Sequence, residues 1–200
     1  MKILYLHGFG SSHASGTVEL LRQHLPTDDI VAPDIPTDPA EALPYLLDYA
    51  AAKAPDLIMG TSMGGMYAQQ LRGYRRILVN PAFNMSTMSQ VLRTGEHRFF
   101  NGRYDGQKTF RITRDIIQRH NMMERRQFKD IPEQDKTLVW GLFATRDVAP
   151  KNYDLFKKHF PADHALRFEG DHQLNDRAVR TALLPLIAQL REEIAAATTE

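Results

Sequence analysis

The sequence predicts an α/β fold, with a mostly parallel sheet of about six strands and helices on both of its faces. Short apolar runs alternate with amphipathic stretches along most of the chain. The apolar runs are nearly continuous, which is typical of parallel strands that are buried on both sides. The chain has 200 residues, which suits one domain with a sizeable core. We therefore expect residues 1–200 to form a single domain.

The first half of the chain is expected to hold four strands and two helices. The expected strands are residues 3–6, 30–34, 57–59 and 76–81, and the expected helices are residues 17–25 and 39–53. Val18, Leu21 and Leu25 recur at helical spacing in the first helix. Pro39 suits the first turn of the second helix, because an N–H there would have no helical partner.

The second half is expected to hold strands at residues 137–143 and 165–168, and helices at residues 152–160 and 176–196. Residues 82–133 interrupt the alternation with a connection of about 50 residues, much longer than is usual in α/β folds. We expect this insertion to be a helical lid over the strand ends. The alternative is an extra pair of crossover helices that only cover the sheet.

Composition excludes several classes of function. The formal net charge is +1, so bulk electrostatics indicate neither a nucleic acid nor an anionic membrane as a partner. The chain has no cysteine, which excludes disulfides and thiolate metal sites. No apolar stretch is long enough to span a bilayer, and the first one is too short for a signal peptide. We therefore expect a cytoplasmic protein.

The most informative motif is Gly60-Thr61-Ser62-Met63-Gly64, which lies between a predicted strand and a helix-like run. A G-x-S-x-G sequence in this setting is typical of the nucleophile elbow, a tight turn that lifts a serine Oγ clear of the sheet. The turn needs glycines because a Cβ at those positions would clash. Ser62 is therefore the candidate nucleophile. The alternative is a glycine-rich turn in which Ser62 caps the next helix.

A serine nucleophile needs a base to take its proton and an acid to orient that base, and the order on this sheet is Ser, Asp or Glu, then His. Asp147 follows the fifth predicted strand and is the candidate acid, although an Asp before Pro150 could instead cap a helix. His172 follows the sixth strand and is the candidate base. Other candidates fit this edge less well, namely Asp130, Asp135, Asp171 and His164.

An oxyanion hole needs backbone N–H donors, and the residue after the nucleophile, Met63, supplies one. The second is expected from the loop after the first strand, at Phe9. In that loop His7, Gly8 and Ser11 are candidates for substrate binding, although a structural role is favoured for His7, whose ring can brace the loop by hydrogen bonds. The loop lacks the glycine spacing and the lysine of the common phosphate-binding motifs.

The insertion adds two further candidates for substrate binding, Met85 and Met88. They belong to a cluster of methionines in residues 82–133. Methionine side chains fill irregular space and adapt to varied partners, which favours a contact with substrate. No group of residues in the sequence indicates a metal site.

The chain resembles the α/β-hydrolase superfamily, and especially the small bacterial YqiA-type esterases. The stretches that carry the resemblance are residues 5–12, 60–65, 78–82, 146–148 and 170–172. The resemblance implies Ser62 as nucleophile, Asp147 as acid and His172 as base, in an esterase of short acyl esters without metal or organic cofactor. Thr61 departs from the serine that is usual there. None of the stretches that carry the resemblance extends into the insertion beyond residue 82, so the resemblance does not imply which substrate is used.

These observations favour a serine hydrolase that cleaves a small-molecule carboxylic ester through an acyl-enzyme intermediate. The same three residues could serve a thioesterase, a peptidase or a lactonase. A different class of function, a noncatalytic binding module on a hydrolase fold, also stays open. The sequence gives no oligomeric state.

Overall fold

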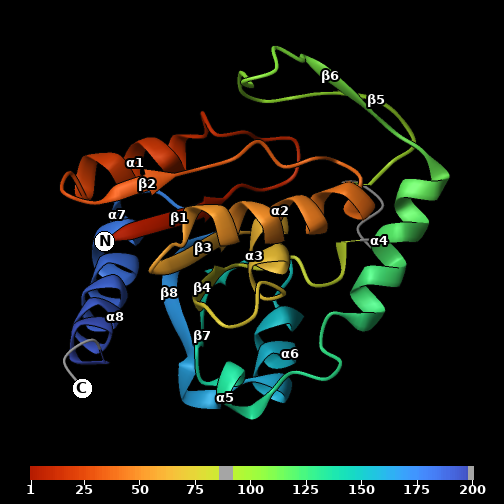
Figure 1. The fold of residues 1–200 in the computed structure, drawn as a ribbon. Helices are drawn as coiled ribbons and strands as arrows, with labels where there is room; N and C mark the ends of the chain where they lie inside the picture. Colours follow the sequence, from red (N-terminus) through yellow and green to blue (C-terminus); the bar gives the residue numbers. More distant parts are fainter. Residues whose placement is uncertain (86–91, 198–200) are drawn as a thin grey trace.

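The protein is described by a computed structural model that covers residues 1–85 and 92–197. Its central sheet has six strands in the order β2-β1-β3-β4-β7-β8, and every neighbouring pair is parallel (Figure 1). The strands are β1 (Lys2–Leu6), β2 (Asp29–Val31), β3 (Leu57–Thr61), β4 (Arg75–Val79), β7 (Val139–Arg146) and β8 (Ala165–Asp171). The parallel six-stranded sheet predicted from the sequence is confirmed.

The helices between these strands also follow the prediction. They are α1 (Gly16–His24), α2 (Pro39–Lys53), α3 (Met63–Ala68), α6 (Lys151–His159), α7 (Asp176–Ala178) and α8 (Leu184–Ala197). The last predicted helix contains a π-helical turn at Val179–Leu183, which joins α7 to α8. Ser15 and Asp38 cap α1 and α2, because each side chain accepts a hydrogen bond from a first-turn N–H.

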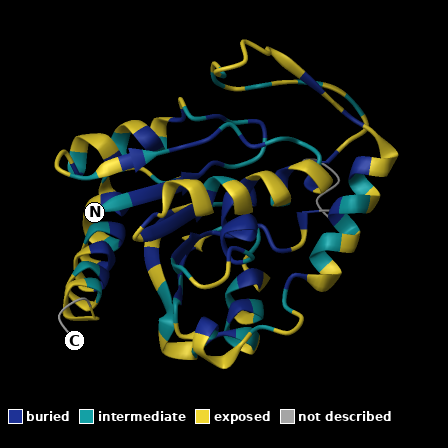
Figure 2. Ribbon diagram, in the orientation of Figure 1, coloured by how far each residue is buried: buried dark blue, intermediate teal, exposed yellow. Residues whose placement is uncertain are grey.

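Helices cover both faces of the sheet, and this explains the apolar character of the strands. In β1, Leu4 and Leu6 pack into the core under α2, α3 and α6, whereas Ile3 and Tyr5 pack into the core under α1 and α8. Alternate residues of β1 therefore pack into cores on opposite faces of the sheet, and both faces of the strand are apolar. The central strands β1, β3 and β4 are accordingly almost fully buried, while the outer surfaces of the helices are exposed (Figure 2).

The prediction of a helical insertion is wrong for residues 95–112. Residues Gly95–Arg98 (β5) and Thr109–Ile112 (β6) form an antiparallel hairpin, followed by α4 (Arg114–Arg126) and the short α5 (Glu133–Lys136). In β6, buried Phe110 and Ile112 alternate with exposed residues. This two-residue period is typical of a strand. It was not recognised in the sequence because the strand is short and polar residues surround it.

The parallel strands place the candidate site residues at one edge of the sheet. The carboxyl ends of β1, β3, β4, β7 and β8 are neighbours there, and open α/β sheets bind ligands at this edge. Loops that are distant in the sequence therefore meet. Within residues 1–85 and 92–197, no helix is long and apolar enough to cross a membrane.

Candidate active site

Ser62 lies in a strained turn between β3 and α3. Its φ and ψ are 54° and −118°, a backbone conformation that residues with a side chain rarely adopt. A Cβ on Gly60 would collide with the Gly64 carbonyl group, and one on Gly64 would collide with the Leu6 carbonyl oxygen. Both glycines of the motif are therefore required by close packing. Ser62 makes no side-chain capping hydrogen bond to α3, so the capping alternative is not realised.

Three side chains from separate loops form one chain of hydrogen bonds. Nε2 of His172 lies 3.0 Å from Oγ of Ser62, and Nδ1 of His172 lies 2.6 Å from Oδ1 of Asp147. The Asp147 side chain is 2% exposed and the His172 side chain 25%, so the acid is shielded while the imidazole reaches the surface. This geometry allows His172 to accept the Ser62 proton while Asp147 holds the Nδ1–H tautomer.

The pairing of β7 with β8 explains why Asp147 meets His172. Arg146 and Asp171, the last residues of these strands, are paired across the sheet. Asp147 and His172 are each the next residue, so they leave the sheet side by side. Asp147 does not cap α6, whose N-terminal flanking residue is Pro150 with no side-chain capping bond.

The competing residues have other partners. Asp135 forms an ion pair of 2.7 Å with buried Arg76, and Asp171 forms one of 2.9 Å with Arg146. His164 stacks on Trp140 and its Nδ1 lies 3.0 Å from the Val139 carbonyl oxygen, at the start of β7. These contacts keep the three side chains away from Ser62.

Asn80 is a site residue that the sequence argument missed. Its side chain is buried behind the histidine loop, where Nδ2 donates to the carbonyl oxygen of His172 at 2.9 Å. Its Oδ1 accepts a hydrogen bond of 2.7 Å from the Ala144 N–H of β7. Asn80 also has a positive φ of 43°, which asparagine tolerates better than most residues. Its place directly after β4, before Pro81, was the available signal.

The loop after β1 lies against the serine turn. A Cβ on Gly8 would be 3.5 Å from Cβ of Ser62, so the backbone of this loop passes directly beside Ser62. β1 and β3 are neighbours in the sheet, with Leu6 opposite Gly60, which brings the loop and the turn together. The Phe9 N–H belongs to this loop, and the Met63 N–H is in the first turn of α3, where helical N–H groups have no helical acceptor.

The contacts of His7 fit the structural role that the sequence favours for it, and they do not fit substrate binding. Its side chain is buried, with Nδ1–H donating to the Gly8 carbonyl oxygen at 2.8 Å and Nε2 accepting from the Ile35 N–H at 3.0 Å. Burial lowers its pKa to about 4, so the ring is neutral. Both nitrogens are used within the protein, and the ring braces the loop. Ser11 Oγ donates to Oδ1 of Asn101 at 3.0 Å, a contact with the insertion.

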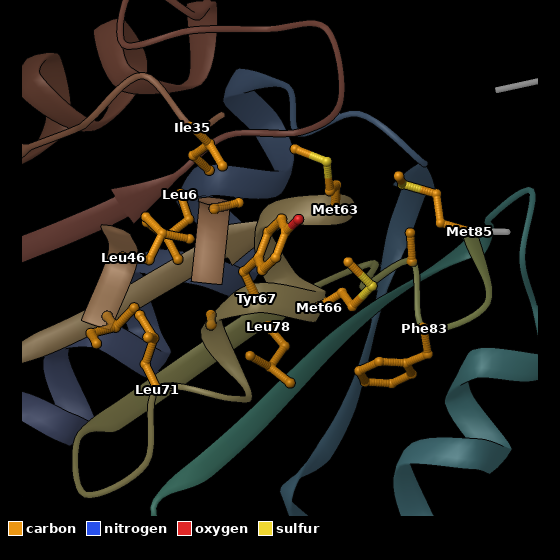
Figure 3. Close-up of a cluster of buried hydrophobic side chains, with 14 of the residues drawn as sticks. Leu6, Ile35, Leu46, Met63, Met66, Tyr67, Leu71, Leu78, Phe83 and Met85 are labelled. Carbon is orange, nitrogen blue, oxygen red and sulfur yellow. The ribbon is translucent and has the colours of Figure 1, made fainter. Parts of the chain in front are cut away.

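The two methionine candidates receive no support. Met85 is 1% exposed and belongs to the core cluster that contains Met63 and Phe83 (Figure 3), so its side chain offers no surface to a ligand. Met88 lies outside the described residues. Met122 and Met123 instead line a cavity of about 520 Å³ between α2 and α4, and none of the predicted site residues is among its lining residues within the described chain.

Among the described residues, no group of three histidine, aspartate or glutamate side chains is arranged to hold a metal ion. The residues that the structure brings together are a serine, a histidine and a carboxylate. Acyl transfer is the chemistry that such groups perform together.

The sheet, the serine turn and the order of the loops define the class as the α/β-hydrolase fold. The chain belongs to the uncharacterised protein family UPF0227, the YqiA family, which it matches over residues 2–184. The resemblance stated from the sequence is therefore confirmed.

Solved structures of similar fold include several esterases. The esterase domain of a Rhodothermus marinus protein has a TM-score of 0.63 at 18% identity, over 94% of this chain and 85% of that one. Esterase B from Lactobacillus rhamnosis, in a structure with a tributyrin phosphonate, has a TM-score of 0.61 at 12% identity, over 100% and 79%. A structure from work on the metagenome-derived lipolytic enzymes LipS and LipT has a TM-score of 0.58 at 16% identity. The match covers 100% of this chain and 94% of that one. At these identities the likeness shows the fold.

Proposed function

We propose that this protein is a serine hydrolase that cleaves carboxylic esters of small molecules through an acyl-enzyme intermediate. The observation that carries the proposal is the continuous hydrogen-bonded chain from Ser62 through His172 to Asp147. A strained serine turn beside a shielded carboxylate and a partly exposed imidazole fits nucleophilic catalysis. The esterases of similar fold support the choice of ester as substrate class.

In the proposed reaction, Oγ of Ser62 attacks the ester carbonyl carbon while Nε2 of His172 takes the hydroxyl proton. The negative charge that develops on the carbonyl oxygen is received by the backbone N–H groups of Met63 and Phe9. His172 then gives its proton to the leaving alcohol. A water molecule, activated by the same imidazole, hydrolyses the acyl-serine and restores the enzyme.

Ser62→Ala tests the proposal directly. We expect the wild-type protein to hydrolyse p-nitrophenyl esters, and the variant to lose about 10⁴-fold or more of kcat while its circular dichroism spectrum is unchanged. A variant that keeps more than about a tenth of the activity would contradict Ser62 as nucleophile. Comparing esters of increasing acyl length with a thioester, a peptide and a lactone identifies the preferred bond.

The rival function is binding without catalysis. A fluorophosphonate probe separates the two, because covalent reaction requires an activated serine. We expect one equivalent of label on Ser62 of the wild-type protein and none on Ser62→Ala. Absence of labelling in the wild-type protein, together with absence of hydrolysis, would favour the binding module.

A further inference from the structure

The tip of the β5–β6 hairpin lies alongside the loop that follows β1, although the two segments are far apart in the sequence (Figure 1). Successive residues of one segment bond successive residues of the other. The contacts are Phe100 N–H to the Gly10 carbonyl oxygen at 2.7 Å, Ser11 Oγ to Asn101 Oδ1 at 3.0 Å, and Ser12 Oγ to the Gly102 carbonyl oxygen at 2.6 Å. The insertion is therefore fastened to the loop that carries Phe9.

Asp34 completes this attachment from a third segment. Its Oδ2 accepts a hydrogen bond of 2.7 Å from the Tyr104 N–H in the hairpin. Its Oδ1 accepts from the backbone N–H of His13 at 2.8 Å and lies 2.9 Å from Nδ1 of the same residue. The rings of His13 and Tyr104 also stack, with centroids 3.4 Å apart. One carboxylate, with a side chain 8% exposed, thus joins both segments.

The charge of Asp34 is maintained by the same contacts. Burial alone would raise its pKa, but the hydrogen bonds from His13 and Tyr104 outweigh burial and hold the pKa below its ordinary value. The group is therefore ionised at neutral pH, and hydrogen bonds to an ionised acceptor are stronger than those to a neutral one.

The hairpin also holds the side chain of Phe9. The Phe9 ring meets Phe110 of β6 edge-on with centroids 5.3 Å apart, and it lies 6.3 Å from the ring of His97 in β5. A Cβ on Gly10 would lie 3.0 Å from the Phe100 ring, so the hairpin approaches the loop backbone closely. Contacts with the hairpin therefore fix both Phe9 and the residue after it.

We propose that the β5–β6 hairpin holds the Phe9 N–H in position to receive the oxyanion, and that Asp34 is the positioning residue that fastens the hairpin there. The inference rests on the proposed function. Gly8 and Gly10 give the loop wide conformational freedom, whereas an oxyanion donor must be fixed before the reaction. The hairpin restricts that freedom, so the insertion contributes to catalysis as well as covering the sheet.

The test compares Asp34→Ala with Asp38→Ala. Asp38 is a matched control, because it also joins the insertion to the body of the protein, through Arg119 of α4 at 2.6 Å, without contacting the Phe9 loop. We expect Asp34→Ala to lower kcat for a p-nitrophenyl ester by about 10²-fold, as for loss of an oxyanion donor, with KM within about threefold. A trifluoromethyl ketone, which forms a tetrahedral oxyanion adduct on serine, should bind about 10²-fold more weakly.

Tyr104→Pro provides a second variant that removes the N–H donor to Asp34 at a position whose side chain is 72% exposed. We expect the same loss of kcat and of ketone affinity. Folded Asp34→Ala or Tyr104→Pro with kcat within about threefold of wild type overturns the inference, as does an equal loss in Asp38→Ala. Wild-type protein without Ser62-dependent hydrolysis overturns the proposed function as well, so the two failures are distinguishable.

Discussion

The side chain of Asn80 donates a hydrogen bond to the carbonyl oxygen of His172, 2.9 Å away, and so connects the end of β4 to the histidine loop. The same side chain accepts from the Ala144 N–H, near the end of β7. One buried amide therefore links three of the segments that carry the site. The bond to His172 restrains the backbone from which the imidazole projects.

Asn80→Ala should lower kcat by about 10- to 100-fold with a smaller change in KM, because the imidazole loses its fixed position. The variant should also lose about 1–3 kcal/mol of unfolding free energy, since buried partners are left unpaired. Steady-state kinetics and urea unfolding measure both. Asn152→Ala is the control, because Asn152 is a buried amide that donates to Pro81 and not to His172. Equal kinetic losses in both variants would argue against a specific role for Asn80.

The losses of activity on replacing the proposed acid, base and nucleophile should not be additive. We expect His172→Ala to be nearly as inactive as Ser62→Ala and Asp147→Asn to be somewhat milder, with the double variant of Ser62 and His172 no worse than Ser62→Ala alone. Residues that act as one unit behave in this way. Single-turnover kinetics with a p-nitrophenyl ester measures the chemical step. Full activity in Asp147→Ala would direct attention to another carboxylate.

The ion pair of Asp135 with Arg76 should support stability and not catalysis. Arg76 is fully buried at the start of β4, and Asp135→Ala would leave its charge without a counter-ion. We expect a loss of about 3–5 kcal/mol of unfolding free energy, with kcat of the folded variant unchanged. Glu133→Ala, which removes an exposed pair with Lys136, should cost less than about 1 kcal/mol. Urea unfolding of both variants measures these losses. Similar small losses of unfolding free energy in both would contradict the view that burial makes the Asp135–Arg76 pair more important for stability.

Stability should fall in mild acid because two buried histidines stay neutral in the folded protein. Burial lowers the pKa of both His7 and His120 to about 4, below their ordinary value near 6.5. Between these values the unfolded chain binds protons that the folded protein does not. The two neutral rings therefore contribute fully to the unfolding free energy above about pH 6.5. This contribution is lost as the pH falls to about 4, by up to roughly 3 kcal/mol for each ring.

Urea unfolding at several pH values from 7 to 4.5 measures this loss. His120→Gln should reduce the slope of unfolding free energy against pH by about half, because one of the two rings no longer titrates. The variant must be compared with wild type at each pH. An unfolding free energy that is constant over this range would contradict the neutral state of the two rings.

The sequence predicted the sheet well because its signals are local. Near-continuous apolar runs mark β1, β3 and β4, and the glycines around Ser62 mark a turn that no other residue type could make. Chain order and strand ends were sufficient to select Asp147 and His172, which do meet in the structure. Their catalytic roles stay predictions until the variants are measured.

The parts that the sequence did not reveal depend on contacts between distant segments. The bonds of Asn80 to His172 and of Asp34 to Tyr104 join segments that lie far apart in the sequence. The β5–β6 hairpin was missed because its strands are four residues each, too short for a clear period. His7 stayed a candidate for substrate binding, although a structural role was favoured, because a histidine beside a glycine loop looks the same in sequence whether it faces a ligand or braces a turn.

The position of β7 in the sheet has a consequence for the chain as it leaves the ribosome. β4 pairs with β7, and the entire insertion is synthesised between them. Until residue 139 and its successors emerge, β4 is the outer strand of a partial sheet made of β2, β1, β3 and β4, and its N–H and C=O groups are unpaired along an apolar edge. A nascent chain in which β4 has emerged and β7 has not therefore exposes an edge onto which a second copy can add a strand. Pairing with β7 closes this edge, because it satisfies the free N–H and C=O groups of β4.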